Sequence, residues 1–163
     1  MLSVELKGAE ELRKALAGLG GAGARRVART AIRKGAKKTL AAAKANARTE
    51  VGGEMGSLIA KYIKIVPFSR QVARRVAGMS IMVSKDGNEH FVVGKNYIPA
   101  ALEYGHVWPG AGGLKGVSAA VRPRAFMRPA WDSTKHQALQ AILDAMRVGI
   151  EREAKRQAAK AKL

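Results

Sequence analysis

Apolar residues recur at helical spacing in the first third of the chain. Leu12, Leu16 and Leu19 lie three or four positions apart, which predicts one apolar helix face over residues 9–19. A longer helix is predicted over 24–48, and a glycine-rich connector is expected at 18–26. The apolar stripe of the longer helix is formed by Ala28, Ile32, Ala36, Leu40, Ala43 and Ala47.

A second long helix is predicted near the end of the chain. It begins at Pro129, since proline is favoured at the first helical position, and Asp132 suits the positive end of the helix dipole. Its apolar face comprises Leu139, Ile142, Leu143, Met146 and Ile150. Beyond this face the residues are polar or alanine, so residues 151–163 are expected to form a basic helical or frayed tail.

Between the helices, apolar and polar residues alternate, which is typical of strands. Strands are predicted over 58–68, 76–84 and 90–93, with a hairpin turn at Asp86-Gly87 joining the last two. A further short strand is expected at 3–7.

A short helix is predicted after these strands. Asn96 is expected to cap it, Pro99 falls in its first turn, and Gly105 ends it. Residues 107–120 then form a long glycine-rich loop.

The expected fold is α+β, with two long helices packed on a small, mainly antiparallel β-sheet. The chain has 163 residues, a size that suits one domain, and we expect that domain to span 1–150. There is no cysteine, which excludes disulfides and thiolate chemistry. No apolar run approaches the roughly 20 residues that cross a bilayer, so no membrane partner is expected.

Catalysis is not predicted, because no enzyme motif is present. The glycine-rich 18–26 segment lacks the preceding buried strand and the terminal G-K-[ST] of a phosphate-binding loop. No serine lies in a G-x-S-x-G turn. Glu103 and His106 are three apart, but Gly105 separates them and no third ligand is placed by the sequence. Neither a metal nor another cofactor is expected.

Charge is the strongest compositional signal. The chain has 30 Lys and Arg against 12 Asp and Glu, a net charge of +18, which is typical of proteins that contact polyanions or acidic partners. No acidic residue occurs between Arg13 and Arg48. A basic stripe is predicted along the helix at 24–48, consisting of Arg26, Arg29, Arg33, Lys37, Lys44 and Arg48. It faces DNA or an acidic protein, or it is only a solvated surface.

The stretch "RPRAFMRPAWDST" at 122–134 holds an aromatic residue between two prolines. Phe126 and Met127 are candidates either for core packing or for anchoring in a neighbouring subunit. Three arginines, Arg122, Arg124 and Arg128, are expected to pair with nearby carboxylates. Glu103 is the first candidate partner for them.

Two of these stretches together resemble the small tail-component family of tailed bacteriophages. Tyr97, Glu103, Tyr104 and Gly105 in "YIPAALEYGH" match one family motif; Pro123, Phe126, Met127, Pro129 and Ala130 match a later one. The stretches "VELKGAEELRKALAGL" and "GSLIAKYIKIV" add to the likeness. His106 departs from the threonine usual there, and the loop at 107–120 is longer than in the family.

This resemblance implies a virion structural protein at the head–tail junction, in a neck or tail-completion role. Such proteins form homo-oligomeric rings, commonly hexamers, through which the genome passes, and they contact head-connector and tail-terminator or tail-tube proteins. The implied assembly residues are Tyr97, Glu103, Tyr104, Gly105, Arg124, Phe126, Met127, Arg128 and Pro129. The alternative, based on the basic stripe alone, is a non-specific nucleic-acid-binding protein.

Overall fold

The computed structural model describes residues 9–68, 78–84, 86, 88–93, 96–109 and 118–160. The strand predicted at 3–7 therefore lies outside the described residues. The described chain forms two compact units. The first contains 9–36, 67–68, 78–80 and 137–160, and the second contains the described residues of 37–66 and 81–136.

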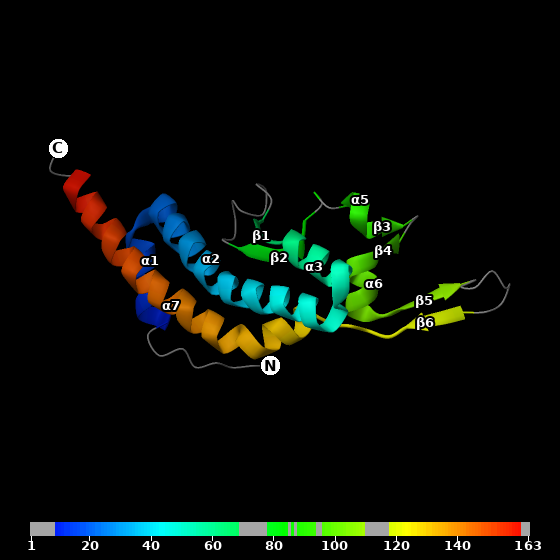
Figure 1. Cartoon of the computed structure of the whole chain (residues 1–163). Helices are drawn as coiled ribbons and strands as arrows, with labels where there is room; N and C mark the ends of the chain where they lie inside the picture. Colours follow the sequence, from blue (N-terminus) through cyan, green and yellow to red (C-terminus); the bar gives the residue numbers. More distant parts are fainter. Residues whose placement is uncertain are drawn as a thin grey trace. The chain divides into compact units, whose positions relative to one another are not determined.

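The fold is mostly helical, with two long helices packed together and short antiparallel strand pairs (Figure 1). The helices are α1 (Ala9–Gly18), α2 (Gly20–Asn46), the π-helical turn η1 (Ala47–Val51), α3 (Gly53–Tyr62), α5 (Asn88–Phe91), α6 (Ile98–Tyr104) and α7 (Met127–Lys160). The strands are β1 (Ile63–Pro67), β2 (Met79–Val83), β3 (Val92–Val93), β4 (Asn96–Tyr97), β5 (His106–Pro109) and β6 (Ser118–Val121). The α+β prediction with two long helices is confirmed.

In the first unit, α2 and α7 approach closely through glycine. A Cβ atom on Gly35 would lie 2.5 Å from Cγ1 of Ile142 and 2.6 Å from the carbonyl oxygen of Ala138. At the other crossing glycine, Gly149, a Cβ atom would lie 2.8 Å from Cγ1 of Val27. Because ordinary carbon contacts lie near 3.5–4.0 Å, both positions require a residue without a side chain.

Gly35→Ala is therefore expected to lower the free energy of unfolding by about 1–3 kcal/mol, the usual cost of overpacking. Chemical denaturation measures it. Gly21→Ala is the matched control, because its Cβ atom would meet only the end of the Arg25 side chain, at 3.7 Å. Alanine has the higher helix propensity, so this control is expected to be neutral or stabilising. Equal destabilisation by both variants would contradict the close approach.

Over most of α2, the buried face lies one residue before the predicted apolar stripe. Ala28, Ile32, Ala36 and Leu40 are half-buried, whereas the buried positions are Val27, Ala31, Gly35 and Thr39, followed by Ala43 and Ala47 as predicted. The prediction from apolar residues missed this face because Gly35 and Thr39 occupy it where α2 and α7 approach closely.

The predicted glycine-rich connector at 18–26 was also wrong in extent. The chain leaves the helix only at Leu19, and α2 begins at Gly20, whose φ is 71°. Gly23 continues the helix because it packs against α7, where a Cβ atom would lie 3.2 Å from Glu153 Cγ.

The second unit has a core of aliphatic and aromatic side chains. Its largest fully buried side chains are Ile59, Ile63, Phe91 and Phe126. The ring of Phe91 meets that of Tyr97 edge to face, with the centroids 6.4 Å apart. Thr39 on α2 and Thr134 on α7 share a hydrogen bond of 2.9 Å, so the two long helices also pack together in this unit.

The strand predicted at 58–68 was wrong in its first half. Residues up to Tyr62 form α3, and only β1 is extended. Gly56, Ile59, Ala60 and Ile63 are all buried, at positions i, i+3, i+4 and i+7. This helical spacing of buried residues outweighs the local alternation.

The hairpin predicted at Asp86-Gly87 was wrong, because β2 pairs with β1 instead. The first half of the partner strand predicted at 90–93 belongs to α5, and β3 pairs with β4. Asp86 is held by hydrogen bonds from Lys64 Nζ at 2.7 Å and Ser84 Oγ at 2.8 Å. These two donors lower the pKa of Asp86.

The remaining boundaries differ by a few residues from prediction. Tyr97, not Asn96, precedes the first turn of α6, while Pro99 in that turn and Gly105 at its end are as predicted. The two flanks of the predicted loop at 107–120 are β5 and β6, which pair from His106↔Val121 to Pro109↔Ser118; residues 110–117 lie outside the described residues. Helix α7 begins at Met127 and continues to Lys160.

Candidate functional site

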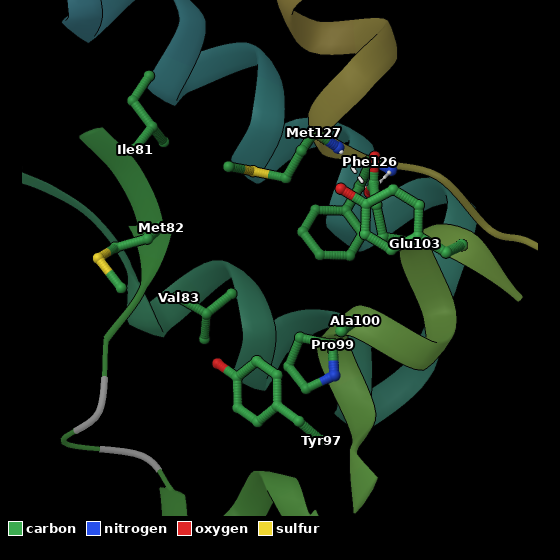
Figure 2. A pocket seen from close by; sticks show the side chains of 10 residues that line it. Ile81, Met82, Val83, Tyr97, Pro99, Ala100, Glu103, Phe126 and Met127 are labelled. Atoms are coloured by element: carbon green, nitrogen blue, oxygen red, sulfur yellow. Dashed lines mark hydrogen bonds between the residues drawn. The ribbon is translucent and has the colours of Figure 1, made fainter. Parts of the chain in front are cut away.

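The carboxylate of Glu103 joins the two stretches that carry the family resemblance. Oε2 accepts hydrogen bonds from the backbone N–H groups of Phe126 at 2.8 Å and Met127 at 2.9 Å. Oε1 accepts one from the N–H of Arg128 at 3.0 Å. Figure 2 shows the bonds from Glu103 on α6 to Phe126 and Met127 at the start of α7. One side chain thus satisfies three consecutive amide groups.

Helix chemistry explains this arrangement. The first N–H groups of an α-helix have no partner within the helix, and the helix dipole favours negative charge at that end. Glu103 lies in the last turn of α6, which Pro99 begins and Gly105 ends with a φ of 76°. Helix α6 therefore places the Glu103 carboxylate at the N-terminus of α7, where backbone N–H groups need an acceptor.

Further bonds fix the residues just before α7, and we call 124–128 the capped turn. The N–H of Arg124 donates to the Leu102 carbonyl at 2.7 Å. Its guanidinium Nη1 donates to the Val51 carbonyl at 3.1 Å, and Asn46 Nδ2 donates to the Phe126 carbonyl at 3.2 Å. The capped turn is therefore tied to α2, η1 and α6 within the second unit.

The predicted pairing of Glu103 with arginine side chains was wrong in its atoms. Glu103 binds backbone amides, and within the described part of the chain no ion pair involves Arg122, Arg124 or Arg128. The guanidinium of Arg128 instead lies over the ring of Tyr104, 6.0 Å from its centroid. The physical reason is that the unpaired amides of α7 are fixed in place, whereas an exposed arginine is satisfied by water.

Of the two alternatives for Phe126, the structure shows core packing. Its side chain is 1% exposed and belongs to the core of the second unit. Met127 is half-buried against the same core, and Pro129 is exposed in the first turn of α7.

A cavity of about 490 Å³ lies beside the capped turn. Figure 2 shows side chains from β2, α6 and the start of α7 around it. Its lining consists of Ile81, Met82, Val83, Tyr97, Pro99, Ala100, Glu103, Tyr104, Phe126 and Met127. Burial raises the pKa of the Tyr97 hydroxyl.

The basic stripe has a different environment from the capped turn. In the first unit, Arg26 pairs with the buried Glu153 at 3.1 Å, while Arg29 and Arg33 are exposed. In the second unit Lys37 and Arg48 are exposed and Lys44 is half-buried. Among the described residues no carboxylate pairs with any stripe member except Arg26, which is therefore structural.

Sequence reasoning missed the cavity and two exposed aromatic side chains, Tyr104 in its lining and Trp131 on α7. Tyr104 is 69% exposed and Trp131 is 55% exposed, and Arg128, which stacks on Tyr104, lies one helical turn before Trp131 on α7. A Tyr at the end of α6 and a Trp near the start of the arginine-containing α7 are a weak signal of a surface site. Their orientation could not be obtained from spacing alone.

In the described part of the chain, no three His, Asp or Glu side chains gather as metal ligands. None of the described helices combines the length and apolarity needed to cross a membrane. Comparison of the chain with protein-family models, with curated proteins and with solved structures finds no significant match.

Proposed function

We propose that this chain is a virion structural protein of a tailed bacteriophage or phage-like particle. It forms a ring at the head–tail junction, in a neck or tail-completion role, and the DNA passes through that ring. The observation that carries the proposal is the Glu103 bridge to residues 126–128. The two stretches that resemble the tail-component family, far apart in sequence, form one bonded unit.

The bridge supports a role in assembly because it makes a stable joint. The backbone of the capped turn is bonded to α2 and α6, and the Arg124 side chain is bonded to η1, so little conformational freedom is left to lose when a neighbour docks. Exposed aromatic and arginine side chains, the types enriched at the centres of interfaces, lie next to it.

Electron microscopy and mass spectrometry of purified particles test this proposal. We expect several copies of the chain arranged as a ring between head and tail, with DNA in the lumen. A hexamer is the expected symmetry. Absence of the chain from mature particles would overturn the proposal. A monomer in solution would not, because the ring can require a partner protein as a template for its assembly.

Non-specific DNA binding is the second candidate function, and the exposed part of the basic stripe favours it. Arg29, Arg33 and Lys37 are exposed on α2 without acidic partners among the described residues. Arginine and lysine bind phosphates of any sequence by releasing condensed counterions. The two functions are compatible, since a ring lumen also meets DNA of every sequence.

A salt titration of DNA binding measures this contribution. Replacing Arg29, Arg33 and Lys37 together by alanine is expected to reduce the slope of log K against log salt by about 2–3, since each lost phosphate contact contributes about 0.9. Lys61→Ala, an exposed lysine on α3, is the control and is expected to change the slope little. An unchanged slope in the triple variant would assign the stripe to an acidic protein or to solvent.

A further inference from the structure

The cavity of the second unit is open to a partner. Met82 is 39% exposed and Ala100 is exposed on its lining. Apart from the Glu103 carboxylate and the Tyr97 and Tyr104 hydroxyls, every lining side chain is apolar. Its volume of about 490 Å³ lies within the range of pockets that bind ligands, roughly 300–1,000 Å³.

The position of β2 indicates the shape of the partner. Ile81, Met82 and Val83 are consecutive, and all three line the cavity. Successive side chains of a strand point to opposite faces, so a cavity that meets three in a row runs along β2 and is not confined to one face of the sheet. In the described residues β1 is the only strand that pairs with β2. An extended segment can therefore continue this sheet and place a side chain in the cavity.

Charge at the cavity indicates what else the segment carries. Glu103, the carboxylate of the lining, has both oxygens engaged by backbone amides. Arg128 is exposed beside it, stacked on the ring of Tyr104, another lining residue. No carboxylate within the described part of the chain neutralises Arg128. A carboxylate on the incoming segment would complement this charge and form a charge-assisted hydrogen bond.

We propose that this cavity binds an extended segment of a partner protein, which inserts a bulky apolar side chain and pairs a carboxylate with Arg128. Backbone pairing along β2 would supply further affinity, and Tyr104 and Trp131 would flank the segment. The inference rests on the proposed function for the source of the segment, a neighbouring protein of the junction. A nucleic acid is the competing ligand, but it has no backbone complementary to a strand edge.

Fluorescence anisotropy with three labelled pentapeptide probes tests the inference on the full-length chain. The first probe carries phenylalanine at its centre and glutamate two positions away on each side, because alternate residues of a strand share a face. The second replaces phenylalanine by alanine, and the third replaces both glutamates by lysine. We expect the first probe to bind at least about ten-fold more tightly than either of the others, a difference of about 1.4 kcal/mol.

Two variants locate the binding, and each has a matched control. Ala100→Trp fills the cavity mouth and is expected to abolish binding of the first probe; Ala41→Trp, at an exposed site on α2, is not. Arg128→Gln is expected to weaken binding about ten-fold, the cost of one lost charge pair. Arg122→Gln, at an exposed arginine outside the cavity lining, is expected to weaken it much less. Circular dichroism verifies that each variant is folded.

Several outcomes would overturn the inference. Equal binding of the first two probes, no binding of the first, or undiminished binding by Ala100→Trp would show that the cavity is not a peptide site. If Ala100→Trp and Arg128→Gln reduce the affinity for a short DNA duplex by the same factor, the surface binds nucleic acid instead of a peptide. These results are independent of the particle experiment, so either the inference or the proposed junction role can fail alone.

Discussion

Phe126→Ala is expected to lower the free energy of unfolding by about 3–5 kcal/mol, the usual cost of removing a buried aromatic ring. The side chain is 1% exposed and belongs to the same core as Ile59, Ile63 and Phe91. Its backbone is also held, since its N–H bonds Glu103 and its carbonyl accepts from Asn46. The backbone at this position is therefore held in place, and removal of the ring leaves a void in the core.

Urea denaturation of the full chain, followed by circular dichroism, measures this change. Trp131→Ala is the control, because Trp131 is a large aromatic residue in the first turns of α7, just after Phe126, and is 55% exposed. Surface substitutions usually change stability by about 0.5 kcal/mol or less. A stable Phe126→Ala variant that loses particle assembly would contradict core packing and favour an interface role for this residue.

Glu103→Ala is expected to destabilise the protein by about 2–4 kcal/mol. Three amides at the start of α7 lose their acceptor, and each buried donor left unsatisfied costs about 1–3 kcal/mol when water cannot reach it. The total is lower than the sum because the amide of Arg128 is exposed and remains hydrated. Glu103→Gln keeps an acceptor oxygen but loses the charge that favours the helix end, so about 1–2 kcal/mol is expected.

Two measurements separate this cap from a general loss of charge. Denaturation gives the free energy of unfolding. Amide hydrogen exchange of Phe126 and Met127 reports their bonds to Glu103, and it is expected to be faster in Glu103→Ala than in the unaltered protein. Glu151→Gln is the control, because Glu151 is exposed in the middle of α7 and is expected to change stability by less than about 0.5 kcal/mol. Unchanged exchange at both amides in Glu103→Ala would contradict the observed bonding.

Helices α1, α2 and α7 were predictable because their signal is local, whereas residues of α3 and α5 were predicted as strands. A helix that buries one side repeats its apolar positions about every 3.6 residues, and this period identified α1, α2 and α7 from leucines, alanines and isoleucines alone. The start of α7 was predicted within two residues, since proline is restricted to the first turn. Strand pairing was not predictable. The Asp86-Gly87 dipeptide predicts that β2 pairs with the strand that follows it, yet β2 pairs with β1, the strand that precedes it.

For the candidate site, the structure bears on one predicted contact, that of Glu103 with the segment around Phe126. Glu103 was correctly assigned to the segment around Phe126, whereas its acceptor role towards backbone amides was not foreseen. Side-chain charge suggests salt bridges in any sequence that contains Arg and Glu. Whether an amide lacks a partner depends on where a helix begins in three dimensions.

The sequence by itself determined the helices α1, α2 and α7, the excess of basic charge and the two stretches that resemble the tail-component family. Those properties depend on spacing and residue type, which the chain states directly. Only the tertiary structure decided that Phe126 lies in the core, that Glu103 caps α7 and that a cavity opens beside Arg128. Each of these depends on which groups, distant in sequence, come within a few ångströms, and hydrophobic and hydrogen-bonding patterns do not specify that proximity.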